Sequence, residues 1–171
     1  MVKNKNIKLD VYSSTQVYGD AFKEANDDKW VPLYKQASEL PNVNYIGYRP
    51  NQFILENLQN YHIFAYPSIW EETSCISAIE CMSAGLYSIV TNYGALYETC
   101  SEFPIYVQYL EDYKLLAKSF ATAIDIAADT LHLEVIQNNL DMQQDFYKRF
   151  YSWKKQADTW SNFLRGVTNV K

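Results

Sequence analysis

Short apolar segments alternate with segments of helical periodicity over residues 7–110. Each apolar segment has the length of a strand, and turn-prone residues such as Gly and Pro separate it from the next helical stretch. The strand segments lie at residues 7–12, 43–46, 62–66, 87–91 and 105–107. Connections of these lengths suit parallel crossovers. We therefore predict an α/β fold with a doubly wound, Rossmann-like parallel sheet.

The helical segments fall between these strands and then continue to the end of the chain. In the sheet region, about 7–110, helices are predicted at 30–40, 50–61 and 74–84, with a loop or short helix at 92–103. A helical tail, about 112–166, follows with segments at 112–128, 131–150 and 153–164. No repeat or low-complexity linker interrupts the 171 residues, so we expect residues 1–171 to form a single domain.

Composition excludes several classes of protein. Hydrophobic residues make up 48% and charged residues 20%, which is an ordinary globular balance. With 15 basic and 20 acidic residues the net charge is −5, so no nucleic-acid partner is expected. No apolar run approaches the length of a membrane span, and the first residues lack a signal-peptide core. We expect a cytoplasmic protein whose three cysteines are reduced thiols.

Motifs for several kinds of chemistry are missing from the sequence. The two histidines lie far apart, and the cysteines lack ligand-like spacing, so no metal site is predicted. The nucleophile motif G-x-S-x-G is absent, as are G-x-G-x-x-G and the Walker loop. In a doubly wound sheet, ligands bind beyond the carboxyl ends of the strands. The residues predicted on this rim are Ser13–Thr15, Gly47–Arg49, Pro67–Thr73 and Thr91–Ala95.

The most informative segment is the helix predicted at 74–84. It is apolar nearly all round, which predicts burial, and Glu80 is its single charge. Glu72 lies eight residues earlier, so two carboxylates flank the first turns, where free backbone N–H groups near Thr73, Ser74 and Cys75 suit an anion. Structural roles stay open, since Glu72 can complement the helix dipole and Glu80 can accept a backbone N–H.

Taken as a string, this segment resembles the C-terminal half of the GT-B glycosyltransferases of the large retaining family 4. The shared pattern is Pro67-Ser68 at a strand end, then Glu72, seven residues and Glu80, with Met82 and Gly85 closing the helix. Further similarity covers about residues 7–165. It comprises the strand ending in Gly47, the loop from Thr91 to Glu98, and the closing helices with Phe150-Tyr151-Ser152-Trp153, Ala157 and Trp160.

The resemblance implies a donor-binding domain that helps transfer a sugar from a nucleotide-diphosphate sugar to an acceptor with retention. In that family pattern Glu80 would bind the ribose hydroxyls, and Glu72 would be the catalytic residue and would contact the donor sugar. Backbone N–H groups of Thr73, Ser74, Cys75 and Ile76 would lie near the sugar and the diphosphate. Ser13 and Ser14 would also lie near the diphosphate, and Gly47, Tyr48 and Arg49 would border the base. No metal or other cofactor is implied.

Two departures from the family pattern carry consequences. The family has Gly-Phe-Gly after its first Glu, where this chain has Thr73-Ser74-Cys75. From Pro50 to Tyr113 there is no Lys or Arg but there are eight acidic residues, whereas a diphosphate leaving group needs positive charge. The family supplies that charge from a strand-loop-helix unit that would precede this sequence. We therefore expect an excised or truncated domain that is inactive alone.

Partners and rival functions follow from this interpretation. A glycan, lipid or protein acceptor would be bound by a missing N-terminal domain, in polysaccharide or glycan biosynthesis. Attachment of the full-length protein to a membrane surface stays open, as does self-association through Trp153, Trp160 and Phe163. The alternatives are a nucleotide-binding or protein-interaction module that has lost catalysis, and a sugar-nucleotide epimerase-like domain. Fold alone does not decide among them.

Overall fold

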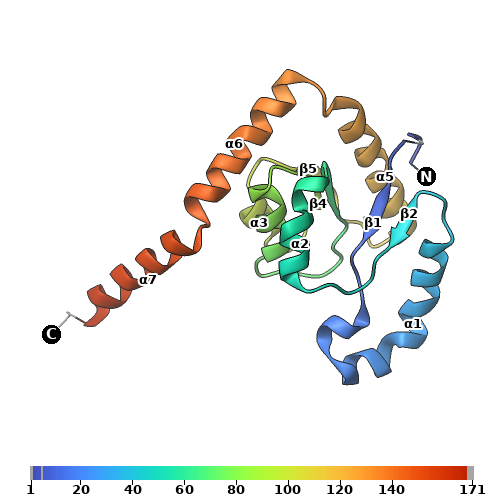
Figure 1. Cartoon of the computed structure of the whole chain (residues 1–171), viewed down its shortest axis with the longest axis horizontal. Helices are drawn as coiled ribbons and strands as arrows, with labels where there is room; N and C mark the ends of the chain where they lie inside the picture. The colour runs from blue at the N-terminus through green and yellow to red at the C-terminus, as the bar shows by residue number, and fades with distance from the viewer. Residues whose placement is uncertain (1, 5, 169–171) are drawn as a thin grey trace. The chain divides into compact units, whose positions relative to one another are not determined.

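The computed structural model describes residues 2–4 and 6–168, which form two compact units. The N-terminal unit is Lys3–Asn57, and the C-terminal unit begins at Leu58. Figure 1 labels their elements. Each unit contains its own parallel sheet with flanking helices.

The N-terminal unit is built on two parallel strands, β1 (Leu9–Val11) and β2 (Val43–Tyr45). A 3₁₀ helix, η1 (Thr15–Tyr18), and the long helix α1 (Asp20–Ser38) connect the two strands, and α2 (Asn51–Asn57) follows β2. Helix α1 begins ten residues before the predicted start at 30. Its first turns are rich in polar helix formers and lack the apolar spacing on which the prediction depended.

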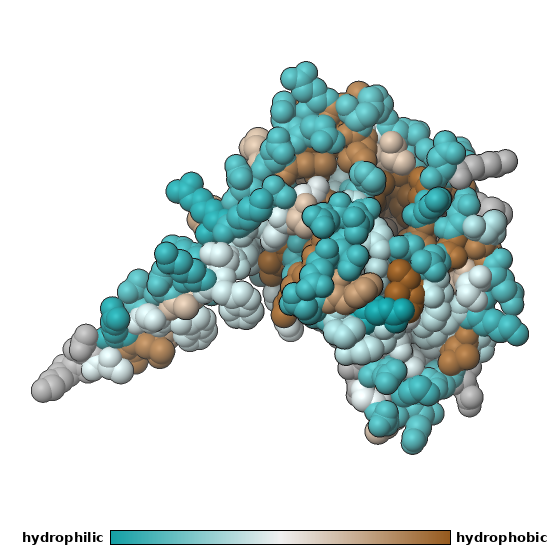
Figure 2. Space-filling model, viewed as in Figure 1, coloured by the Kyte–Doolittle hydropathy of each residue, from teal (hydrophilic) through white to brown (hydrophobic). Residues whose placement is uncertain are grey.

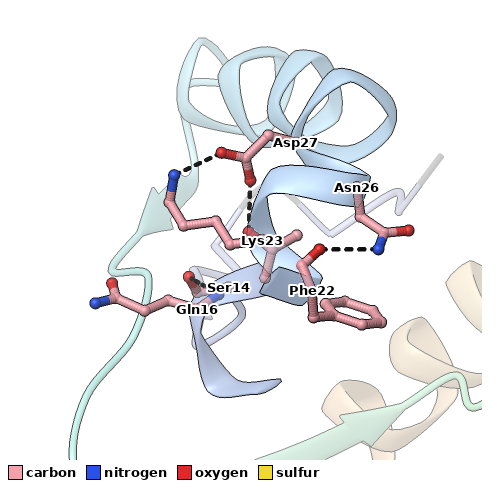
Figure 3. A network of polar contacts seen from close by, with 7 residues as sticks. Ser14, Gln16, Phe22, Lys23, Asn26 and Asp27 are labelled. Atoms are coloured by element: carbon pink, nitrogen blue, oxygen red, sulfur yellow. Dashed lines mark hydrogen bonds and ion pairs between the residues drawn. The ribbon is translucent and has the colours of Figure 1, made fainter. Parts of the chain in front are cut away.

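Side-chain contacts in the N-terminal unit join α1 to the segment before it (Figure 3). Thr15 Oγ1 donates a 2.7 Å hydrogen bond to one oxygen of Asp27, and Lys23 Nζ lies 2.6 Å from the other. The hydrogen bond from Lys23, followed by that from Thr15, lowers the pKa of Asp27 below its usual value. These contacts fix the turn between β1 and α1 even though Gly19, the residue before the helix, gives it no side-chain cap.

The C-terminal unit has a three-stranded parallel sheet in the order β3-β4-β5. The strands are β3 (Ile63–Tyr66), β4 (Tyr87–Thr91) and β5 (Ile105–Val107). The helices are η2 (Leu58–Asn60), α3 (Ile76–Ser83), α4 (Leu96–Cys100), α5 (Tyr113–Thr130), α6 (Glu134–Phe150) and α7 (Trp153–Thr168).

Strand β4 is the centre of this unit because both of its faces are buried. Successive strand residues point to opposite faces, and Val90 packs with α3, α4 and Tyr147 of α6, whereas Ile89 packs with Val107 and α5. Helices α3 and α5 accordingly lie on opposite sides of the sheet in Figure 1. Helices on both faces of a parallel sheet define a doubly wound arrangement.

The predicted fold class is confirmed as Rossmann-like α/β with a helical C-terminal region. The strands, however, pair as two sheets, one in each unit, where the sequence predicted one. The predicted tail also begins with a helix that is part of the sheet domain, because α5 buries Leu116, Phe120, Ala123 and Ala127 against β4 and β5. A single domain over residues 1–171 stays a prediction.

Candidate functional site

The carboxyl ends of β3 and β4 are tied together by the loops that leave them. Thr91, the last residue of β4, donates a 2.7 Å hydrogen bond from Oγ1 to the carbonyl of Ser68, just beyond β3. Both residues are buried. The loop that leads from Pro67 to α3 contains Glu72 and precedes the helix of Glu80, and it therefore starts from a fixed point on the sheet.

Glu72 lies in this loop and is half-buried. Its Oε1 accepts a 2.5 Å hydrogen bond from the hydroxyl of Tyr66, the last residue of β3. Burial raises the pKa of the Tyr66 phenol, and the bond to Glu72 raises it further. The phenol is therefore protonated at neutral pH and acts as the donor to the carboxylate.

The backbone of Glu72 is held by the loop that follows β4. Its N–H donates to Trp70 at 2.9 Å, and its carbonyl accepts the N–H of Ala95 at 2.8 Å. Gly94 has φ +56°, and a Cβ at this position would lie 2.6 Å from the Glu72 nitrogen. The two loops thus meet at a distance that only glycine permits.

Helix α3 is shorter and more exposed than predicted. It spans Ile76–Ser83 instead of 74–84, with Cys75 as its N-cap residue. Ile76 is 66% exposed, whereas Ala78 and Met82 are buried in the cluster that includes Val90 of β4 and Tyr147 of α6. The prediction of a helix buried all round is therefore wrong, because α3 packs through one face only.

The residues whose backbone was predicted to meet the diphosphate differ in exposure. Thr73 and Ser74 are exposed, and Cys75 is 4% exposed. The first N–H groups of a helix have no partner within the helix itself, but in α3 those of Ser77 and Ala78 bond to the sulfur of Cys75. That the N–H groups of Thr73 to Ile76 meet a ligand stays a prediction. Burial raises the pKa of the Cys75 thiol, so this side chain adds no charge at neutral pH.

Glu80 is the fifth residue of α3 and is half-buried. Its neighbour Cys81 has a pKa raised to about 12, mainly by burial and further by the charge of Glu80. The sequence predicted Glu80 as the single charge of a buried helix, whereas the side chain is half-buried. Its role in binding a ligand stays a prediction.

A tyrosine stack between the loops that follow β4 and β5 was not predicted from the sequence. The rings of Tyr93 and Tyr109 stack with centroids 4.0 Å apart, and the Tyr93 hydroxyl lies 3.3 Å from Oε1 of Glu71. Asn92 joins the same loops, since its side chain donates to Gln108 and accepts from the N–H of Tyr109. These contacts stiffen the loop that carries Gly94.

The predicted residues of the N-terminal unit also come together. The carbonyl of Val11, at the end of β1, accepts the N–H groups of Ile46 and Gly47, beyond β2. Tyr45 donates from its hydroxyl to the carbonyl of Ser13 at 2.7 Å. Ser13–Ser14 and Gly47–Arg49 therefore lie at the same end of the β1–β2 sheet. That they share one rim with Glu72 and Glu80 stays a prediction.

The two serine hydroxyls already have partners in this unit. Ser14 Oγ accepts the N–H of Gln16 at 3.1 Å and caps η1 (Figure 3). Ser13 Oγ lies 3.3 Å from the hydroxyl of Tyr34. Both border an open groove of about 350 Å³ in the N-terminal unit, lined by Ser13, Ser14, Thr15, Phe22, Trp30, Leu33 and Tyr34.

Arg49 and Tyr48 are exposed at the end of the β2 strand. The Arg49 guanidinium donates to the carbonyl of Tyr48 at 2.8 Å and lies 5.8 Å from the centre of the Phe53 ring. Tyr48 is 46% exposed. Both side chains are thus accessible to a ligand.

The described residues also bear on metal sites and on membrane spans. Over residues 2–4 and 6–168, no cluster of three or more His, Cys, Asp or Glu side chains has the arrangement of a metal site. In the same residues, no helix combines the length and the apolar character needed to cross a membrane.

The fold of the chain is similar to that of a solved structure. The crystal structure of a glycosyltransferase from Rickettsia africae ESF-5 is similar to 98% of the chain, with a TM-score of 0.71 and 14% sequence identity. The chain spans 50% of the length of that protein. At this identity the similarity establishes the fold. A search of curated protein sequences gives no significant match.

The family is established by the sequence itself. The model of the family described as "Glycosyl transferases group 1" matches residues 5–139, which is most of the chain. The chain belongs to this family. The match includes both candidate glutamates, the loop that contains Gly94, and the strand ends of both units.

Proposed function

We propose that this chain is the donor-binding part of a retaining glycosyltransferase, which transfers a sugar from a nucleotide-diphosphate sugar to an acceptor. The observation that carries the proposal is the family match over residues 5–139. Within that match, Glu72 lies in the loop beyond the carboxyl end of β3, where ligands bind in doubly wound folds, and Glu80 lies in the helix to which this loop leads.

Each predicted residue has a role in this proposal. Glu80 accepts hydrogen bonds from the ribose hydroxyls, and Glu72 accepts them from hydroxyls of the donor sugar and acts at the reacting centre. A carboxylate can accept two hydroxyl groups at once, which suits vicinal diols. Backbone N–H groups at Thr73 to Ile76 lie near the diphosphate, without a metal.

The family pattern gives further roles to residues of the N-terminal unit. Ser13 and Ser14 lie near the diphosphate, and the segment from Gly47 to Arg49 borders the base. Tyr48 is exposed and presents a ring on which a base can stack.

Charge sets a limit on what this chain does alone. Residues 50–113 contain no Lys or Arg, so this stretch offers no side chain that neutralises a diphosphate leaving group. The chain spans half of the similar Rickettsia protein. We therefore assign the basic side chains, and the glycan, lipid or protein acceptor, to a further domain of a longer cytoplasmic protein.

The experiment that tests this function is a titration of the isotope-labelled chain with UDP, GDP, ADP and UDP-glucose, followed by backbone amide NMR. We expect one nucleotide to shift amides at Gly47–Arg49 and at Glu72–Glu80. Shifts with one nucleotide only would identify the base. No specific shift with any of the four would contradict donor binding by this chain.

Glu80 provides the sharpest single substitution for the nucleotide. Glu80→Gln keeps the shape of the side chain but removes its charge, and a hydrogen bond to a charged group is worth about 1.5–3 kcal/mol. We expect the Kd of the nucleotide to rise by about tenfold or more while the fold is retained. Glu102→Gln, an equal charge change at an exposed residue of the same unit, is the control. An unchanged Kd for Glu80→Gln would remove Glu80 from the site.

The second candidate is a nucleotide-binding or protein-interaction module that has lost catalysis. It is favoured by the eight acidic and no basic residues from Pro50 to Tyr113. The sequence that precedes this chain in its gene discriminates the two functions. An upstream strand-loop-helix unit with an Arg and a Lys supports catalysis, and the lack of any basic residue there supports the module.

A further inference from the structure

We propose that Tyr66 is a positioning residue, whose phenol holds the carboxylate of Glu72 in the orientation that receives hydroxyl groups of the donor sugar. This inference rests on the proposed function, since it concerns the same site. It adds a residue that the sequence pattern did not single out.

The ring of Tyr66 is anchored in the core of the C-terminal unit. Tyr66 is the last residue of β3, and it packs against the buried cluster that contains Cys75, Ala78 and Val90. Its ring also stacks on Phe64, with centroids 5.6 Å apart and planes 13° apart. A ring held in this way has little freedom, so its hydroxyl presents a fixed donor to the loop above the strand.

The backbone of Glu72 is fixed independently of this contact. The Ala95 N–H holds its carbonyl, and Gly94 packs against its nitrogen. With the backbone fixed, only the side-chain torsions of Glu72 remain to be set. The 2.5 Å hydrogen bond from Tyr66 to Oε1 sets them.

The chemical nature of the hydrogen-bond donor, the phenol of Tyr66, matters as much as its position. A phenol is neutral, whereas Lys or Arg would form an ion pair with the carboxylate. Residues 50–113 contain no Lys or Arg. Within this stretch, the hydrogen bond from Tyr66 orients the Glu72 carboxylate without neutralising its charge. A carboxylate has about four acceptor positions, so a single phenol leaves capacity for sugar hydroxyls. The carboxylate is oriented before the ligand arrives, which reduces the entropy lost on binding.

The test compares two ligands that differ only in the sugar. The full chain is titrated with UDP and UDP-glucose, and with GDP and GDP-mannose, and the ratio of the two Kd values in each pair measures the contribution of the sugar. Tyr66→Phe removes one oxygen atom and keeps the ring in the core. We expect this variant to bind the nucleoside diphosphate as the wild type does, but to lose on the order of tenfold in the preference for the sugar form.

Two further variants keep the test decisive. Tyr106→Phe is the matched control, because Tyr106 is also a half-buried tyrosine of the same sheet, and its hydroxyl donates to the carbonyl of Ser101. It should leave both Kd values unchanged. Glu72→Gln should lose the sugar preference without altering the core, and adding Tyr66→Phe to it should cause little further loss.

The outcomes separate this inference from the proposed function. Wild-type protein that binds no nucleotide would overturn both. Wild-type protein that binds nucleoside diphosphates without any preference for the sugar form would overturn the role of Tyr66 but leave nucleotide binding intact. A folded Tyr66→Phe that keeps the full preference, or one that loses affinity for both ligands equally, would show that Tyr66 has no role specific to the sugar.

Discussion

Gly94 is the residue whose backbone most restricts the candidate site. Its φ of +56° lies in the left-handed region, and a Cβ would meet the nitrogen of Glu72 at 2.6 Å, where backbone cannot give way as a flexible side chain can. The left-handed conformation alone costs a residue with a Cβ about 1–2 kcal/mol. We expect Gly94→Ala to exceed this cost in the free energy of unfolding, measured by denaturant titration.

Substitutions at two other glycines of the same unit distinguish the cost of the backbone conformation from the cost of the close contact. Gly85 has φ +86°, but a Cβ there meets only the side-chain end of Gln144, at 3.1 Å, so Gly85→Ala should cost little more than its conformation. Gly166 lies in α7 with open space around it, and Gly166→Ala should stabilise the helix by up to about 1 kcal/mol. Equal losses for Gly94→Ala and Gly85→Ala would mean that the approach of the two loops is not tight.

The sequence predicted the residues of the candidate site better than their contacts. The Glu72 and Glu80 pair was singled out because its spacing and the Pro67-Ser68 before it resemble a glycosyltransferase family pattern. Tyr66 was not found, because its partner lies six residues away across a loop and only the path of that loop brings the two together. Gly94 carries a weak signal, since a glycine after a strand indicates a turn, but nothing in the sequence indicates which backbone it meets.

At the scale of elements, buried Gln143 links α6 to the end of α3. Its Nε2 donates to the carbonyls of Met82 and Leu86, both at 3.1 Å, and these carbonyls lie at and just beyond the end of α3. Its Oε1 is buried and has no hydrogen-bond partner among the residues that the structure describes. Gln143 therefore holds the C-terminal end of the helix that carries Glu80.

We expect Gln143→Leu to destabilise the chain by about 1–2 kcal/mol, because it removes one of two donors from each of two buried carbonyls. It also removes the unpartnered oxygen. Thermal and denaturant unfolding would measure this loss. The matched control is Gln137→Leu, because Gln137 makes a similar 2.6 Å bond to the Leu131 carbonyl on the exposed surface, where water can replace it. That change should stay within about 0.5 kcal/mol. Equal effects of the two substitutions would contradict a bridging role for Gln143.

Strands marked by a short apolar run between turn residues were predicted with their observed bounds. Strands β4 and β5 match the predicted residues 87–91 and 105–107, because each is a short apolar run with turn residues on both sides. The start of α1 was missed since its early turns are held by polar contacts such as Thr15 with Asp27. The pairing into two sheets could not be predicted, because strand order depends on contacts between distant segments.

For the whole molecule, the apolar face of α7 is the feature that most affects behaviour in solution. None of its described residues is buried, and Trp153 is 88% exposed, Trp160 62% and Phe163 60%. Figure 2 shows pale and brown side chains along the lower edge of this helix and hydrophilic ones along the upper edge. Exposed apolar patches of this kind mark surfaces that associate with another apolar surface.

We expect the chain to self-associate through this face in a concentration-dependent manner, as measured by sedimentation velocity. At 100° per residue, Trp160 and Phe163 lie on the apolar side of α7, whereas Lys155 and Asp158 lie on the opposite side. The double substitution of Trp160 and Phe163 by Ser should therefore shift the distribution to monomer, because it removes apolar area from one helix face. The double substitution of Lys155 and Asp158 by Ser leaves the net charge unchanged and should leave the association unchanged. Monomeric wild-type chain at every concentration, or equal effects of the two pairs, would rule out association through this face.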